Sequence, residues 1–146
     1  MCDFLSAVVL RNGDVLHHDA TDHHSDLVRH YKLPDDRECR HFAKVEFTPP
    51  VKDGVPDYAD ADGYTLRVDE ETEPQWFAEL REQVEQKCRS IVRAMLVADE
   101  RDLLLGGCWI LVGGAKVRDA KSARIVAMYD TSRVGSMSDT SRVGSM

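Results

Sequence analysis

The chain has 146 residues, of which 26 are acidic and 19 are Lys or Arg, so its net charge is -7. This acidic balance argues against a nucleic-acid partner and against an anionic membrane surface. The chain has no apolar run near the ~20 residues of a membrane span and no secretory leader, and its four scattered cysteines are typical of a reduced protein, which together predict a cytoplasmic location.

Residues 3–18 predict a β-hairpin. Two apolar segments flank Asn12-Gly13, and this dipeptide favours the type I′ turn, in which both central residues have positive φ. A short helix is expected to begin near Thr21 or Asp22 and to end before Pro34, because proline cannot continue a helix.

The middle of the chain predicts two further strands and a long helix. Residues 42–47 alternate apolar and polar side chains, as in a half-buried strand, and residues 64–68 form a second candidate. Residues 51–63 are rich in Pro, Gly and Asp and predict a loop. A helix is expected over residues 73–97, where apolar residues recur with helical spacing. They are Trp76, Leu80, Val84, Cys88, Ile91, Met95 and Leu96.

The C-terminal segment is an identical tandem repeat. The octapeptide Asp-Thr-Ser-Arg-Val-Gly-Ser-Met occupies residues 130–137 and again 139–146. Residues 115–120 and 123–128 fit a looser form of the unit: a small residue, a base, a β-branched residue, two variable residues, then Met or Ala. The bases recur at steps of eight, nine and nine residues. They are Lys116, Arg124, Arg133 and Arg142.

A step of eight to nine residues predicts a turn plus a short strand, and we expect a β-solenoid. Nine extended residues span about 30 Å, so two repeats are expected per coil. Three chains sharing a triangular shaft are the alternative, and a disordered tail is the competing interpretation that the regular apolar spacing opposes. The expected core residues are Val117, Ile125, Met128, Val134, Met137, Val143 and Met146, and the expected turn residues are Asp130, Gly135, Asp139 and Gly144.

The repeats resemble those of uncharacterised phage and bacterial proteins, in which a short N-terminal domain precedes S-S-x-V-G-x-M repeats. The matching residues are Ser132, Val134, Gly135, Met137, Ser141, Val143, Gly144 and Met146. The segments 1–7, 45–50, 65–69 and 104–108 are also similar to such proteins. The resemblance brings no established activity with it.

These patterns predict an α+β fold: a small antiparallel sheet with one long helix, followed by a short C-terminal β-solenoid. Residues 1–103 would form a capping domain, and residues 104–146 the solenoid, with units near 115–120, 123–128, 132–137 and 141–146. We expect a non-enzymatic assembly protein without a cofactor, whose open C-terminal end mediates self-association as a dimer or trimer. The alternative is a small binding or regulatory module with the repeats as a stalk.

Three features are weighed as chemical sites. His17, His18, His23 and His24 lie among carboxylates and could bind a metal ion, but their spacing matches no standard motif and favours a solvated polar loop. Cys2 would become an N-terminal nucleophile if Met1 were removed, as in class II glutamine amidotransferases. Their pattern continues Cys-Gly-Ile, unlike Cys2-Asp3-Phe4, so a buried thiol is expected and no catalytic residue is assigned.

The recurring bases are the third feature. Lys116, Arg124, Arg133 and Arg142 would lie at regular intervals along a regular array and could contact a polyanion. The structural interpretation is favoured: Asp130 and Asp139 precede two of these bases by three residues and would neutralise them, which stacked like charges require.

Overall fold

The computed structural model describes residues 4–19, 21–138 and 141–143, with only the backbone described at 142 and 143. Its contacts divide the chain into two compact units. The first comprises Met1–Pro56 and Asp60–Ile91, and the second comprises Asp57–Ala59 and Val92–Met146. The boundary expected between residues 103 and 104 lies within a strand, β8 (Glu100–Leu105).

The first unit is built on an antiparallel sheet with the strand order β2-β1-β3-β6. The strands are β1 (Leu5–Leu10), β2 (Val15–Leu16), β3 (Phe42–Thr48) and β6 (Thr65–Val68). The predicted hairpin is present, since β1 pairs with β2, but its turn is not the expected type I′: Gly13 has a positive φ of 94°, whereas Asn12 does not. A smaller hairpin, β4 (Val51–Lys52) with β5 (Val55–Pro56), and a 3-10 turn at Ala61–Gly63 lie where a loop was expected.

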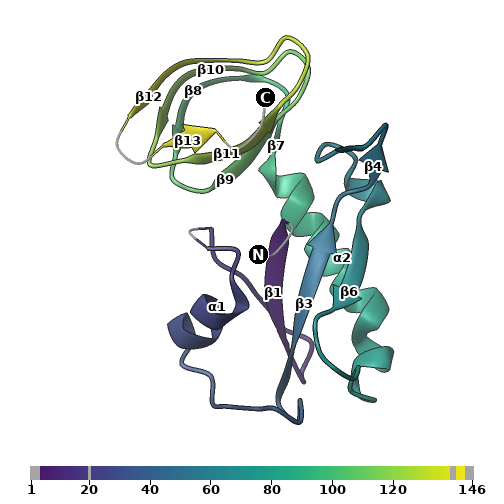
Figure 1. The fold of residues 1–146 in the computed structure, drawn as a ribbon. Helices are drawn as coiled ribbons and strands as arrows, with labels where there is room; N and C mark the ends of the chain where they lie inside the picture. The colour runs from purple at the N-terminus through teal and green to yellow at the C-terminus, as the bar shows by residue number, and fades with distance from the viewer. Residues whose placement is uncertain (1–3, 20, 139–140, 144–146) are drawn as a thin grey trace. The chain divides into compact units, whose positions relative to one another are not determined.

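One helix covers each face of this sheet (Figure 1). Helix α2 (Phe77–Met95) lies along one face, where Val84 and Cys88 are fully buried and the Arg89 guanidinium stacks over the Phe47 ring. Helix α1 (His24–His30) lies on the other face, where Leu27 packs with residues of β1 and β3. The second face of the sheet is therefore buried as well. Glu46 of β3 points to this face and is buried there.

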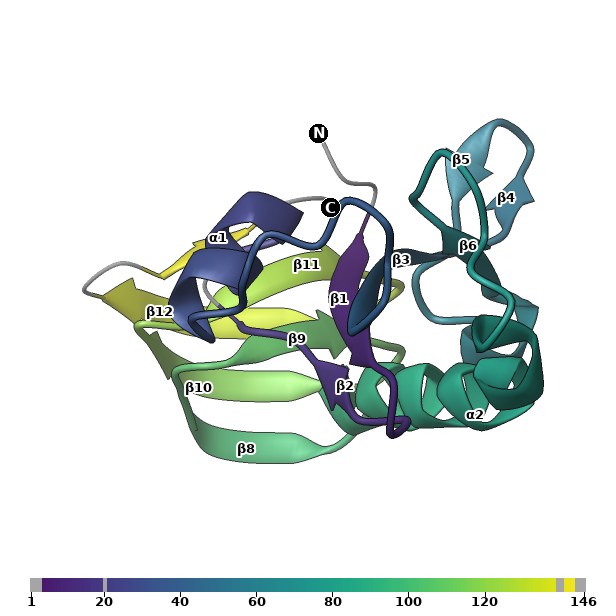
Figure 2. The ribbon, with the colours of Figure 1, turned by 90° about the horizontal axis from the view of Figure 1, so that it is seen from below.

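The second unit contains two parallel sheets. One has the order β12-β10-β8, with β10 (Lys116–Lys121) and β12 (Arg133–Ser138), and its strands lie side by side in Figure 2. The other has the order β13-β11-β9-β7, with β7 (Leu96–Val97), β9 (Cys108–Leu111), β11 (Arg124–Met128) and β13 (Arg142–Val143). Consecutive sequence repeats therefore lie in alternate sheets.

An apolar core lies between these two sheets. Each of its residues is at most 2 % exposed, and Trp109, Met128 and Val134 pack against it in part. The core residues are Val97, Leu104, Leu111, Ala115, Val117, Ala120, Ala123 and Ile125.

The predicted fold class is wrong. The described residues form two α-helices and four small sheets, two of them parallel, and no solenoid is detected among them. A solenoid depends on many stacked coils. The described residues supply only three strands to one parallel sheet and four to the other, and the outermost β13 is two residues long. The short helix expected before Pro34 is present as α1 and covers the second face of the antiparallel sheet, so a fold class with one long helix leaves out part of the architecture.

Candidate functional site

The outermost strand of the three-stranded parallel sheet has one open edge. Among the described strands, β12 pairs only with β10, so backbone N–H and C=O groups on its other side have no strand partner. Side chains are also more exposed at this edge than in the middle of the sheet. Leu104, Ala120 and Met137 share one register position, and their exposures are 2 %, 0 % and 37 %.

Gly135 holds β12 close to β10. A Cβ atom at this position would lie 2.6 Å from the carbonyl oxygen of Arg118, which is closer than real Cβ atoms approach other atoms. Gly135 was expected in a turn, but it lies within β12, and its φ angle is not in the left-handed region, so the need for glycine here is steric. Asp130, in the turn before β12, does adopt a positive φ of 52°.

The predicted core residues are placed unevenly. Val117 and Ile125 are buried, and Met128 and Val134 pack partly against the core, whereas Met137 is 37 % exposed. The backbone of Val143 pairs with Ile125. Met146 and the turn residues Asp139 and Gly144 lie outside the described residues.

The recurring bases form two pairs rather than one row. Lys116 is in register with Arg133 in one parallel sheet, and Arg124 with Arg142 in the other. Lys116 also forms an ion pair of 3.4 Å with Glu100, its neighbour on the opposite side. One register position of the first sheet therefore reads Glu100, Lys116, Arg133 from edge to edge and ends in a positive charge at β12.

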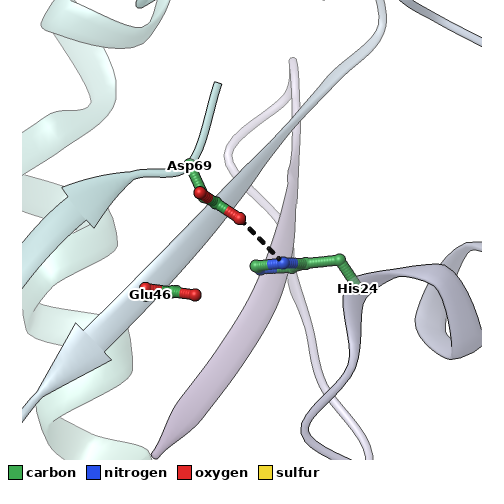
Figure 3. A group of neighbouring side chains, drawn as sticks. All are labelled: His24, Glu46 and Asp69. Carbon is green, nitrogen blue, oxygen red and sulfur yellow. Dashed lines mark ion pairs between the residues drawn. The ribbon is translucent and has the colours of Figure 1, made fainter. Parts of the chain in front are cut away.

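A cluster of potential metal ligands lies in the first unit, on the face of the sheet that α1 covers. It consists of His24, Glu46 and Asp69, and one nitrogen or oxygen atom of each lies within 4.8 Å of the other two (Figure 3). His24 opens α1, Glu46 lies in β3, and Asp69 follows β6 directly. Three elements that are distant in sequence thus deliver one side chain each.

The orientation of the His24 ring is fixed by the backbone. Its Nε2 lies 2.8 Å from the carbonyl oxygen of Val45. A carbonyl oxygen only accepts hydrogen bonds, so Nε2 carries the hydrogen and donates it. The other ring nitrogen, Nδ1, then points toward Asp69, with 3.3 Å to Oδ2. The ring is 7 % exposed, so this arrangement is buried.

Glu46 is also buried, at 4 % exposure, although it alternates with apolar residues along β3. Arg67, directly opposite on β6, pairs with its carboxylate and with Asp69 at 3.5 Å. On the other side, Ser6 of β1 is directly opposite Glu46 and so lies on the same face. The Ser6 hydroxyl is 2 % exposed as a residue and has no hydrogen-bond partner among the described residues.

Of the four predicted histidines, His24 alone joins such a cluster in the described part of the chain. His23 precedes α1, is 54 % exposed and lies 3.5 Å from Asp22. The His18 ring packs on His30 at 4.5 Å. His17 lines a surface groove of about 700 Å³ between β2 and α2. Its pKa is lowered, mainly because the ring is buried.

Cys39, Cys88 and Cys108 are buried, and no disulfide bond forms among the described residues. Burial is the main cause that raises the pKa of Cys39 to about 11 and that of Cys88 to about 12. Thiols with such pKa values stay protonated at neutral pH and make poor nucleophiles. Cys2 lies outside the described residues.

No helix in the described part of the chain combines the length and apolar character that crossing a membrane requires. No family model, no curated protein and no solved structure matches the chain. The similarity to phage and bacterial repeat proteins therefore stays a prediction.

Proposed function

We propose that the protein is a non-catalytic assembly protein that forms a homodimer through the open edge of β12. The observation that carries the proposal is the uncovered apolar position at this edge, where Met137 is 37 % exposed while the equivalent Ala120 is fully buried. An edge strand with unpaired backbone groups and half-covered apolar side chains is a template for pairing with another chain.

The charge on β12 favours an antiparallel pair of β12 strands. A parallel, in-register pair would place Arg133 about 5 Å from Arg133 of the second copy, beside Lys116. In an antiparallel pair centred between Gly135 and Ser136, each Arg133 lies opposite Ser138. The two guanidinium groups are then five residues apart along the strand, about 17 Å, which exceeds the Debye length of ~10 Å at 0.1 M salt.

The same register brings apolar residues together. Val134 of each copy lies opposite Met137 of the other, so that four partly covered side chains shield one another from water. Such a two-fold contact is self-complementary and stops at the dimer, and two-fold dimers are the commonest homo-oligomers.

The proposal is tested by the solution mass of the full chain and of two lysine variants. The chain is expected to reach twice its 16.5 kDa with increasing concentration, and Met137→Lys to remain a monomer, since a lysine blocks an edge. Leu105→Lys is the matched control. Leu105 is 67 % exposed on β8, the opposite edge strand of the same sheet, and this change should leave the dimer intact.

Three results would contradict the proposal: a monomeric full chain at all concentrations, a dimeric Met137→Lys variant, or masses that grow beyond the dimer. The rival hypothesis, a binding or regulatory module with the repeats as a stalk, has the groove along α2 in its favour. It predicts a monomer throughout, so the same measurement separates the two.

A further inference from the structure

We infer that His24, Glu46 and Asp69 form a binding site for a divalent transition-metal ion, with zinc as the best match. The inference concerns the first unit and is independent of the proposed self-association. It depends on the hydrogen bond that fixes the His24 ring, on the charge balance of the cluster, and on the buried hydroxyl of Ser6.

The first argument concerns the two atoms that face each other. Because Nε2 donates to the Val45 oxygen, the ring turns its other nitrogen, Nδ1, toward Asp69 Oδ2 at 3.3 Å. A ring nitrogen and a carboxylate oxygen held this close need a positive charge between them, which a metal ion can supply. Tetrahedral zinc binds nitrogen and oxygen at 2.0–2.2 Å, so its ligand atoms are about 3.4 Å apart. The His24–Asp69 separation already has this value.

The second argument is the orienting bond itself. A metal-binding histidine usually donates its other ring N–H to a backbone carbonyl or a carboxylate, which fixes the tautomer and the ring orientation. The bond from His24 Nε2 to the Val45 oxygen provides this, at 2.8 Å. Val45 is itself fully buried within β3, so the acceptor belongs to a rigid strand.

The third argument is charge. Glu46 and Asp69 contribute two negative charges, and Arg67 contributes one positive charge that it shares between them. One negative charge from these three side chains therefore remains beside the His24 ring. The Arg67 side chain is 60 % exposed and can turn outward into water. A divalent ion would take its place on Glu46, which has to move closer to His24 because the three ligand atoms are spread over as much as 4.8 Å.

The fourth argument is the Ser6 hydroxyl. It is buried beside Glu46 and has no hydrogen-bond partner among the described residues, and such groups normally have one. A water molecule on the fourth position of the metal would supply the missing partner. The exposed side of the cluster is at Asp69, whose side chain is 40 % exposed, so an ion can enter there.

The ligand set also sets the metal class. One imidazole nitrogen with two carboxylates suits zinc, cobalt, nickel or manganese, whereas magnesium and calcium prefer oxygen ligands alone. We therefore expect Zn²⁺ and Co²⁺ to bind and Mg²⁺ to leave the protein unchanged.

The test is a titration of the chelator-treated full chain with Zn²⁺, followed by calorimetry, and with Co²⁺, followed by visible absorption. One ion per chain is expected, with tetrahedral cobalt bands. Asp69→Asn should weaken Zn²⁺ binding at least ~10-fold. Loss of a residue that only hydrogen-bonds to a metal ligand already weakens binding by ~10- to 100-fold, and Asp69 is proposed as a ligand itself. His23→Gln is the matched control: this exposed neighbour of His24 should have no effect.

Arg67→Gln separates the metal site from a purely structural role of the cluster. Removing the competing guanidinium should strengthen Zn²⁺ binding, although the ion pair with Glu46 is lost. The inference is overturned if no ion binds stoichiometrically, if Asp69→Asn binds as tightly as the unchanged chain while its circular dichroism is native, or if Arg67→Gln binds more weakly.

Discussion

Replacing Gly135 with alanine is expected to weaken the pairing of β12 with β10. The added Cβ would lie 2.6 Å from the Arg118 carbonyl oxygen, while real Cβ contacts essentially never fall below 3.0 Å. The two backbones must therefore separate by about 0.4 Å, and β10 cannot retreat freely because β8 holds its other side. Overpacking of this kind costs about 1–3 kcal/mol.

Whether Gly135→Ala stabilises or destabilises the protein distinguishes a conformational effect on the unfolded chain from a steric clash in the folded one. Where backbone angles suit both residues, Gly→Ala stabilises a protein by about 0.4–1 kcal/mol, because it restricts the unfolded chain. Gly135 has no positive φ, so without the close approach to Arg118 the substitution would be stabilising. A destabilised variant thus reports the steric contact itself.

Amide hydrogen exchange of β12 is the measurement. The Arg133 N–H donates to the Ala115 oxygen at 2.9 Å and is a suitable reporter. A cost of 1–3 kcal/mol predicts exchange about 5- to 150-fold faster. Ser138→Ala, an exposed change in the same strand, is the control. Unchanged or slower exchange in Gly135→Ala would refute the reasoning.

Two further predictions concern single hydrogen-bonding groups. Tyr129→Phe removes the acceptor of the Tyr58 N–H, which lies 2.8 Å from the phenol oxygen. The substitution should lower the free energy of unfolding by about 1 kcal/mol and speed hydrogen exchange of the Tyr58 amide. Unaltered exchange would contradict this prediction. Burial acts to raise the pKa of Asp36, but bonds from the N–H groups of residues 40–42 outweigh it and hold the pKa below its usual value. The stability that ionised Asp36 provides is complete at neutral pH and is lost as the pH falls below about 4. Asp36→Asn should be less stable than the unchanged chain by about 1 kcal/mol at pH 7 and should lose less stability as the pH falls below about 4. If the free energy of unfolding of Asp36→Asn falls with pH as steeply as that of the unchanged chain, Asp36 does not provide this stability.

The local elements of the first unit were predictable because their signals are local. The hairpin around Asn12-Gly13, the alternation over residues 42–47 and the apolar spacing of the long helix correspond to observed elements, although the turn is not of the expected type I′. The helix is shorter than expected, Phe77–Met95 rather than residues 73–97. Helix ends depend on capping and tertiary contacts, which periodicity does not report.

The arrangement of the C-terminal strands was harder to predict. The repeats correctly placed short strands at β10, β11, β12 and β13. The spacing of a repeat does not say whether enough layers are stacked to make a solenoid, and the expected architecture was wrong. The role of Gly135 was also missed, because its close contact with Arg118 exists only once two strands are paired.

The metal-ligand cluster was predictable only in part. His24 was among the candidate histidines, but Glu46 and Asp69 were not. Alternation in β3 assigned Glu46 to a solvated face, since a strand pattern cannot reveal that α1 covers that face. A carboxylate that is 4 % exposed is the signal that identifies the site, and burial of this kind follows only from the tertiary structure.

Because repeat units alternate between the two parallel sheets, the sheet that holds the last unit depends on whether the number of units is odd or even. Lys116 and Arg133 are two units apart and share one sheet, while Arg124 and Arg142 share the other. The units at 130–137 and 139–146 are identical, so deleting or duplicating one of them together with Ser138 leaves a junction of unchanged sequence. A change by one unit therefore moves the outermost strand from one sheet to the other, and a change by two restores it. Length variants with odd and even unit numbers would thus present different outer faces without a single amino-acid substitution.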